Sequence, residues 1–207
     1  MEELYTTIER EATAEFEEKR SVFIGHALPV KTEEEAAAFV KELKNRYRDA
    51  THNVFAYVLG DGTVQRYSDD GEPQGTAGMP VLDVIRKNGC TDTAIVVTRY
   101  FGGTLLGAGG LVRAYSHAAK LALDEAHVIT YEKYVLLKLF CSYSEYGKYL
   151  AETEKFGLIN DGVDFADIVC MNLAVKKSRI QDFEKLIVDL SNGKLELEKV
   201  GERFDYR

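Results

Sequence analysis

The stretch between Tyr67 and Tyr115 contains the residues best suited to bind a ligand. It holds an acidic turn, Ser68–Pro73, and the segment RYFGGTLLGAGGLVRAY at residues 99–115. Glycine is frequent throughout this stretch, and glycine permits positive φ angles and a close approach of the backbone to a bound molecule. A packed core does not require such a density of glycine, whereas a binding surface does.

The charges of this stretch indicate that the ligand is an anion. Between Thr93 and Lys120 there is no acidic residue, while Arg99, Arg113 and Lys120 are cationic, although the whole chain has a formal net charge of −8. This distribution predicts a confined anion site and argues against a protein that coats nucleic acid with its entire surface. The alternative is that these cations pair with Asp69, Asp70 or Glu72, and the sequence leaves both possibilities open.

A long alanine-rich helix is predicted from about Ala108 to Asp124, directly after the glycines. The free N–H groups at its start and its dipole favour a phosphate or carboxylate, and the aromatic pair before the glycines could stack on a base. In the alternative reading, the glycines form only a tight turn and Phe101 belongs to the core. The candidate ligand-binding residues are Arg99, Tyr100, Phe101, Gly102, Gly103, Gly107, Arg113, His117 and Lys120.

The acidic turn and the loop that follows it form the second candidate feature, consisting of Asp69, Asp70, Gly71, Glu72, Gly75, Thr76 and Gly78. The three carboxylates of Asp69, Asp70 and Glu72 are oxygen ligands that could hold Mg²⁺ beside a bound phosphate. Such carboxylates also cap backbone N–H groups or pair with arginine. We therefore expect no cofactor and keep magnesium as the weaker alternative.

Motifs of hydrolases are missing from the sequence. It has no GxSxG or HExxH motif, and its three cysteines are scattered without CxxC spacing. His52 precedes an apolar strand and is expected to be structural. Scattered cysteines, the polar N-terminus and the lack of a long apolar run predict a cytoplasmic protein that does not cross a membrane. No DNA-specific motif is present.

The pattern of apolar residues predicts two α+β domains, at 1–130 and 134–207. In the first, Thr32 and Glu35 form a capping box before a helix, and AIVVT at residues 94–98 is typical of a central strand. The second reads β-α-β-β-α-β, the order of a ferredoxin-like fold, with a capping box predicted at Ser178 and Gln181.

The motifs DDGEPQGTAGMP and RYFGGTLLGAGGLVRAY resemble those of the YigZ/IMPACT family. The resemblance implies that the first domain has the fold shared by GHMP kinases and a ribosomal small-subunit protein. It also implies that the second domain is similar to a domain of elongation factor G. In this family, eukaryotic relatives regulate translation through protein contacts, and we expect this chain to lack their additional N-terminal domain.

Together these observations predict a non-enzymatic binding protein associated with translation. Its expected partner is RNA, the ribosome or a translation factor, contacted through the glycine-rich anion-binding surface. The alternative is a Mg²⁺-dependent enzyme of GHMP-like fold that handles a nucleotide or a phosphate.

Overall fold

The protein is described by a computed structural model that covers residues 4–195 and 197–206. The chain divides into two compact units, one formed by Tyr5–Thr130 and the other by the residues from Tyr131 onward together with Leu4. Both contain an antiparallel sheet with helices, so the predicted α+β class is confirmed. Among the described residues, no helix is long and apolar enough to span a membrane.

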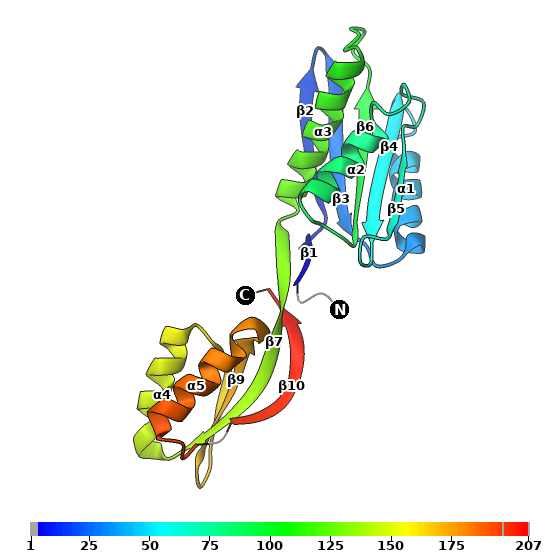
Figure 1. Ribbon diagram of the computed structural model, residues 1–207. Helices are drawn as coiled ribbons and strands as arrows, with labels where there is room; N and C mark the ends of the chain where they lie inside the picture. The colour runs from blue at the N-terminus through cyan, green and yellow to red at the C-terminus, as the bar shows by residue number, and fades with distance from the viewer. Residues whose placement is uncertain (1–3, 196, 207) are drawn as a thin grey trace. The chain divides into compact units, whose positions relative to one another are not determined.

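Up to residue 130 the chain forms a five-stranded antiparallel sheet between helices, preceded by a short strand. The strands are β1 (Leu4–Ile8), β2 (Ala12–Glu18), β3 (Ser21–Pro29), β4 (His52–Leu59), β5 (Val64–Ser68) and β6 (Thr93–Tyr100), and the helices are α1 (Glu33–Arg46), α2 (Gly78–Lys87) and α3 (Ala108–Glu125). The strand order is β2-β3-β6-β4-β5. Helices α2 and α3 cover one face of this sheet and α1 covers the other (Figure 1).

The local signals of this unit have the predicted effect. Half of the capping box predicted at Thr32 and Glu35 is present: the Thr32 hydroxyl accepts a hydrogen bond of 3.2 Å from the Glu35 amide and caps α1, whereas the Glu35 carboxylate accepts from the Lys31 amide at 2.6 Å. The AIVVT run lies in β6, the middle strand, where Ile95 and Val97 face α2 and α3 while Ala94 and Val96 face the α1 side. A strand buried on both faces needs such a continuous apolar run.

The second unit has the element order predicted from the sequence. Its elements are β7 (Val128–Cys141), α4 (Tyr143–Phe156), β8 (Ile159–Phe165), β9 (Val169–Lys176), the short 3-10 helix η1 (Lys177–Arg179), α5 (Ile180–Ser191) and β10 (Leu197–Asp205). Its strands lie in the order β10-β7-β9-β8, all antiparallel, and α4 and α5 pack on one face (Figure 1).

The capping box predicted at Ser178 and Gln181 is wrong. Ser178 lies inside the 3-10 turn, so it is not at the N-cap, and α5 begins only at Ile180 after Arg179, whose side chain makes no capping bond. The capping box of this unit belongs to α4. There the Glu145 carboxylate accepts from the Ser142 amide at 3.3 Å and from its hydroxyl at 2.6 Å.

Helix α3 packs so closely on β3 that only glycine fits at residue 25. A Cβ atom on Gly25 would lie 2.4 Å from the Ala118 carbonyl oxygen and 3.0 Å from the Ala122 Cβ. The first of these atoms is backbone, so the helix itself would have to move. This contact sets the distance between α3 and the sheet.

We therefore expect Gly25→Ala to lower the free energy of unfolding by about 1–3 kcal/mol, the usual cost of overpacking a core. Urea denaturation measures it. Gly109→Ala is the matched control, because a Cβ at Gly109 meets no atom within 4 Å and alanine favours the helix. Equal stability of both variants would contradict the tight contact.

His26 is buried on the α1 side of β3. Its side chain shares a hydrogen bond of 3.1 Å with the Thr13 hydroxyl, its ring centroid lies 5.0 Å from that of Tyr47, and its Nε2 atom has no partner among the described residues. Burial, assisted by the charge of Arg46, lowers the pKa of His26 to about 4 from 6.5. The fold therefore requires the neutral ring.

Because the folded pKa of His26 is depressed, its contribution to stability is complete above pH 6.5 and is lost as the pH falls toward 4. The total loss is of the order of 3 kcal/mol, since each unit of pKa corresponds to about 1.4 kcal/mol. Urea denaturation across this pH interval should show a smaller loss for His26→Gln than for the native chain. His117→Gln, at an exposed histidine, is the control. Identical pH profiles for all three proteins would refute this assignment.

Candidate functional site

Three neighbouring strands place a row of side chains on the face of the sheet that α3 covers. In the sheet register Arg99 of β6 lies opposite Phe23 of β3 and opposite His52 of β4. Phe23 packs in the core beneath α3, with its ring centroid 5.3 Å from that of Tyr115. Arg99 therefore enters the molecule between an aromatic ring and an imidazole.

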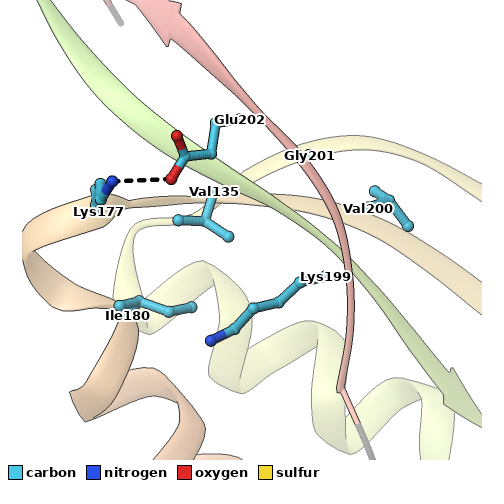
Figure 2. A pocket seen from close by; sticks show the side chains of 7 residues that line it. All are labelled: Val135, Lys177, Ile180, Lys199, Val200, Gly201 and Glu202. Atoms are coloured by element: carbon cyan, nitrogen blue, oxygen red, sulfur yellow. Dashed lines mark ion pairs between the residues drawn. The ribbon is translucent and has the colours of Figure 1, made fainter.

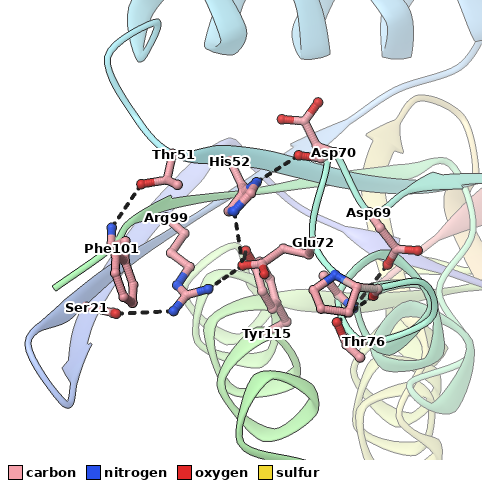
Figure 3. A network of polar contacts seen from close by, with 12 residues as sticks. Ser21, Thr51, His52, Asp69, Asp70, Glu72, Thr76, Arg99, Phe101 and Tyr115 are labelled. Carbon is pink, nitrogen blue, oxygen red and sulfur yellow. Dashed lines mark hydrogen bonds and ion pairs between the residues drawn. The ribbon is translucent and has the colours of Figure 1, made fainter. Parts of the chain in front are cut away.

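Arg99 is buried in a polar network, and only 4% of its surface is exposed (Figure 3). Its Nη1 atom donates to Glu72 Oε1 at 2.5 Å, and the Tyr115 hydroxyl donates to the same oxygen at 2.7 Å. Its Nη2 atom reaches the Ser21 hydroxyl at 3.4 Å. Glu72 is also buried, at 8% exposed, so the pair is shielded from water.

Two aromatic rings enclose the guanidinium group. The Arg99 Cζ atom lies 5.4 Å from the centroid of Phe23 and 5.4 Å from that of Phe101, distances at which a cation is attracted to a ring. Phe23 is fully buried, whereas Phe101 is 44% exposed. Phe101 thus separates the buried pair from solvent, and the alternative that placed Phe101 in the core is wrong.

The electrostatics of this network keep Tyr115 protonated. Burial, and then the negative charge of Glu72, raise the pKa of Tyr115 far above its ordinary value. The hydroxyl therefore remains a hydrogen-bond donor to the carboxylate at any physiological pH. Glu72 Oε1 thus accepts hydrogen bonds from both the Arg99 guanidinium and the Tyr115 phenol.

The position of Arg99 corrects the sequence prediction for this residue. Arg99 was expected to face a phosphate, but its Nη1 atom is engaged by Glu72 in the interior. The other possibility, pairing with the acidic turn, describes the structure. The charges in the sequence could not decide between a solvent-facing and a paired Arg99, because Arg99 and its partner Glu72 are 27 residues apart in the chain.

His52 joins this network to the acidic turn. Its Nδ1 atom lies 2.8 Å from the Asp70 carbonyl oxygen, which can only accept, so Nδ1 carries the hydrogen. Its Nε2 atom faces Glu72 Oε1 at 3.8 Å. These contacts fit the structural role expected for His52.

The carboxylate of Asp69 caps α2. It accepts hydrogen bonds from the amides of Gly75 at 2.9 Å, Ala77 at 3.1 Å and Gly78 at 2.8 Å. These amides would otherwise lack partners at the helix start, where a negative charge is also favoured by the dipole. Thr76 closes the same loop by donating to the Pro73 carbonyl at 2.7 Å.

Asp70 points in a different direction. Its two oxygens bind the Lys44 ammonium group at 2.5 Å and the Asn53 amide at 2.6 Å. With Asp69 at α2 and Glu72 on Arg99, the three carboxylates of the turn have separate partners. No group of three histidine, cysteine or acidic side chains within residues 4–195 and 197–206 could hold a metal, so the weak magnesium prediction for Asp69, Asp70 and Glu72 is not supported.

The exposed part of the glycine-rich stretch is the loop 101–107 and the first turn of α3. Leu105 is 82% exposed, and Gly107 is the N-cap of α3, which has no side-chain cap. Gly102 packs against the backbone of the β2–β3 turn, since a Cβ there would lie 2.0 Å from the Arg20 carbonyl. The loop therefore lies next to the exposed cations Lys19 and Arg20.

The remaining predicted cations lie along the outside of α3. Arg113, His117 and Lys120 are all exposed. Lys120 pairs with Asp124, and the His117 ring lies 4.7 Å from the ring of Phe16. Arg113 forms no ion pair with any described residue. The structure thus separates the buried Arg99 from an exposed group at the start of α3.

Tyr100 ends β6, and its hydroxyl donates to Asp49 at 3.1 Å. Gly103 and Gly107 both have positive φ angles in the loop, while Gly71 and Gly75 have them near the acidic turn. The predicted motif residues therefore belong to two groups, a buried scaffold and an exposed loop.

The second unit contains a pocket of about 470 Å³ at the bulge of β10 (Figure 2). Its lining residues are Val135, Lys177, Ile180, Lys199, Val200, Gly201 and Glu202. Lys177 pairs with Glu202 at 2.9 Å and Lys199 with Glu184 at 2.7 Å. Both cations have carboxylate partners within the protein, so the pocket presents no free charge for an anion.

Sequence reasoning missed two members of the buried network. Ser21 links Arg99 to the Gly102 amide, which donates to its hydroxyl at 3.2 Å, and the sequence did not predict these contacts. Tyr115 was placed on the core face of α3, which is correct, but its bond to Glu72 was not expected. A tyrosine where an apolar stripe would admit phenylalanine was the available signal, since a buried hydroxyl needs a partner.

Comparison with known proteins identifies relatives of both units. Residues 19–123 match the Impact N-terminal domain family, and residues 139–194 match a domain of unknown function (DUF1949). The chain is 35% identical over 196 residues to the IMPACT family member YvyE of Bacillus subtilis, covering 94% of this chain and 90% of that protein.

Two further matches extend along most of the chain. It is 32% identical to the IMPACT family member YigZ of Escherichia coli, over 86% of this chain and 89% of that protein. A crystal structure described as that of a hypothetical protein is 30% identical, with a TM-score of 0.61, and covers 97% of this chain and 98% of that one.

Removal of the Glu72 carboxylate should strongly destabilise the protein. We expect Glu72→Ala to lower the free energy of unfolding by about 3–5 kcal/mol, because Arg99 would remain buried without its counter-charge. Urea denaturation followed by circular dichroism measures the change. Glu42→Ala, which breaks the exposed pair with Arg46, should cost no more than about 1 kcal/mol. Similar losses in both variants would show that the buried pair has no special role.

Proposed function

This chain belongs to the IMPACT family, in the two-domain form of its bacterial relatives, and we propose that it is a non-enzymatic binding protein of translation. Its partner is RNA, in the ribosome or elsewhere, and its binding surface is the loop 101–107 with the first turn of α3. We propose a cytoplasmic location.

For the folds we propose the assignments that the family resemblance implied. The second unit is ferredoxin-like and similar to a domain of elongation factor G; its β-α-β-β-α-β order and antiparallel sheet support this. The first unit shares the fold of GHMP kinases and a ribosomal small-subunit protein. Both assignments are compatible with a protein that contacts RNA.

The observation that carries the proposal is the exposure of an uncapped helix start beside an exposed aromatic ring. Helix α3 begins at Ala108, after the N-cap Gly107, with no side-chain cap and no acidic residue in its first turn. Its first amides and its dipole are therefore suited to a phosphate group. Phe101, 44% exposed, offers a face on which a base can stack.

Cations close to this surface support the same ligand. Lys19 and Arg20 lie in the turn that packs against Gly102, and Arg113 lies on the second turn of α3. None of the three forms an ion pair with a described residue, so their charges are available to phosphates. The buried Arg99 takes no part in binding and instead holds the base of the loop.

The acidic turn weakens the enzyme alternative. A Mg²⁺-dependent reaction would need Asp69, Asp70 or Glu72 as metal ligands, but their oxygens accept from amides, a lysine and an arginine. The contacts of these carboxylates instead favour a structural role.

A labelled single-stranded oligoribonucleotide should bind the full chain in a salt-dependent manner. We expect the affinity to fall steeply between about 50 and 200 mM salt, because phosphate contacts release counterions.

The variant Phe101→Ala should lose about 1–3 kcal/mol of binding free energy if a base stacks on Phe101. Arg113→Ala should reduce the salt slope by about one phosphate contact, or roughly 0.7. Fluorescence anisotropy measures all three.

Arg86→Ala is the matched control, since Arg86 lies in the last turn of α2 in an ion pair of 3.7 Å with Asp83. It should leave the affinity and the salt slope unchanged. Absence of binding at low salt, or binding that does not respond to salt, would exclude RNA as the partner of this surface.

A further inference from the structure

The turn between β2 and β3 has a strained backbone. Its two residues, Lys19 and Arg20, join the paired residues Glu18 and Ser21, and both have positive φ angles, of 48° and 68°. A two-residue hairpin loop with two positive φ angles is a type I′ turn, which is most often built from Asn-Gly. The Cβ atom makes this left-handed conformation costly, so the turn holds two long side chains at the expense of stability.

The other positive φ angles outside glycine in the described chain have local explanations. They occur in aspartate, histidine and asparagine, the residue types that tolerate this conformation best, at Asp70, Asp92, His127 and Asn192. The side chains of both aspartates and of the histidine also bind neighbouring groups of the protein. The side chains of Lys19 and Arg20, by contrast, are exposed and form no hydrogen bond or ion pair with a described residue. No such contact therefore offsets the strain of this turn.

The strained turn is fixed next to the base of the loop 101–107. A Cβ on Gly102 would lie 2.0 Å from the Arg20 carbonyl, so the backbones of the loop and of the turn are in contact. Ser21 directly follows the turn, and its hydroxyl accepts from the Gly102 amide at 3.2 Å. Phe101, which precedes Gly102, lies over the Arg99 guanidinium and is 44% exposed (Figure 3). The two cations and the exposed ring are thus carried by backbone segments that touch each other.

The charge of the turn acts at short range. Glu17 and Glu18 precede it and are exposed, and neither forms an ion pair with Lys19 or Arg20. Because two acidic and two basic side chains cancel at a distance, the turn exerts little long-range attraction on an anion. In direct contact the balance differs, since lysine and arginine donate hydrogen bonds that a phosphate accepts, whereas ionised carboxylates have no donor.

We infer that Lys19 and Arg20 are direct phosphate contacts of the RNA surface and that the fold gives up stability to present them. The inference rests on the RNA-binding function proposed above and adds the residues that hold the RNA backbone beside a base on Phe101. A turn that only connected β2 to β3 would be more stable with asparagine and glycine, which adopt positive φ angles with less strain. A phosphate partner explains why two cations stand there instead.

Two double variants of the full chain separate charge from strain. Lys19→Asn with Arg20→Gly removes the cations and the strain together, so its midpoint of urea denaturation should rise. Its affinity for the single-stranded oligoribonucleotide should fall about tenfold, with a salt slope smaller by roughly 1.4, or about 0.7 for each lost phosphate contact. Lys19→Gln with Arg20→Gln removes only the cations, so it should lose the same affinity without a rise in the midpoint.

Lys41→Gln with Lys87→Gln is the matched control. It removes two exposed cations of α1 and α2 that form no ion pair with a described residue, and it changes the net charge by the same amount. Binding should be unchanged in this control, and an equal loss of affinity would overturn the inference because only net charge would then matter.

The inference also fails if Lys19→Asn with Arg20→Gly gives no gain in stability, or if that variant binds as tightly as the native chain. Normal binding by that variant, with weaker binding by Phe101→Ala, would refute the inference and leave the proposed function standing. A native chain that binds no oligoribonucleotide at low salt would refute both.

Discussion

The buried ion pair of Arg99 and Glu72 is the interaction on which the first unit depends. A charged pair excluded from water is stable only when its remaining donors and acceptors find partners, since desolvation costs several kcal/mol per ion. Here Tyr115 supplies a partner for the Glu72 carboxylate and Ser21 one for Arg99 Nη2, and two aromatic rings enclose the guanidinium, whose buried Nε atom has no hydrogen-bond partner among the described residues. The pair thereby connects the acidic turn, β6 and α3, which are distant in the sequence.

This constraint explains why an exposed glycine-rich loop can have a defined position. The loop starts two residues after Arg99, and the same Ser21 hydroxyl that contacts Arg99 accepts from the Gly102 amide. The Phe101 amide is also bonded, to the Thr51 hydroxyl at 3.0 Å. The base of the loop is therefore fixed to the scaffold, while its apolar and amide groups remain at the surface for a partner.

Periodicity predicted the elements well, because apolar spacing and capping residues act locally. The helix after Thr32 and the central strand at residues 94–98 follow from such signals. Ser178 shows their limit, since the same residues that suggest a capping box also permit a 3-10 turn. The site was only partly predictable: the residue types were identified correctly, but whether Arg99 faces solvent depends on the sheet register and on a partner 27 residues away.

The partition of charge changes how the acidic character of the chain should be interpreted. A formal net charge of −8 suggests a surface that repels anions everywhere. However, the charge of Glu72 is neutralised inside the fold by Arg99, and the Asp69 carboxylate accepts hydrogen bonds from amides at the start of α2. The acidic turn therefore contributes little negative electrostatic potential at the surface. Lys19, Arg20 and Arg113 are exposed around the loop and form no ion pair with a described residue, although Glu17 and Glu18 precede Lys19 in the chain and are exposed as well. Cations without ion-pair partners near the start of α3 can therefore favour an anionic partner there, although the chain as a whole is acidic.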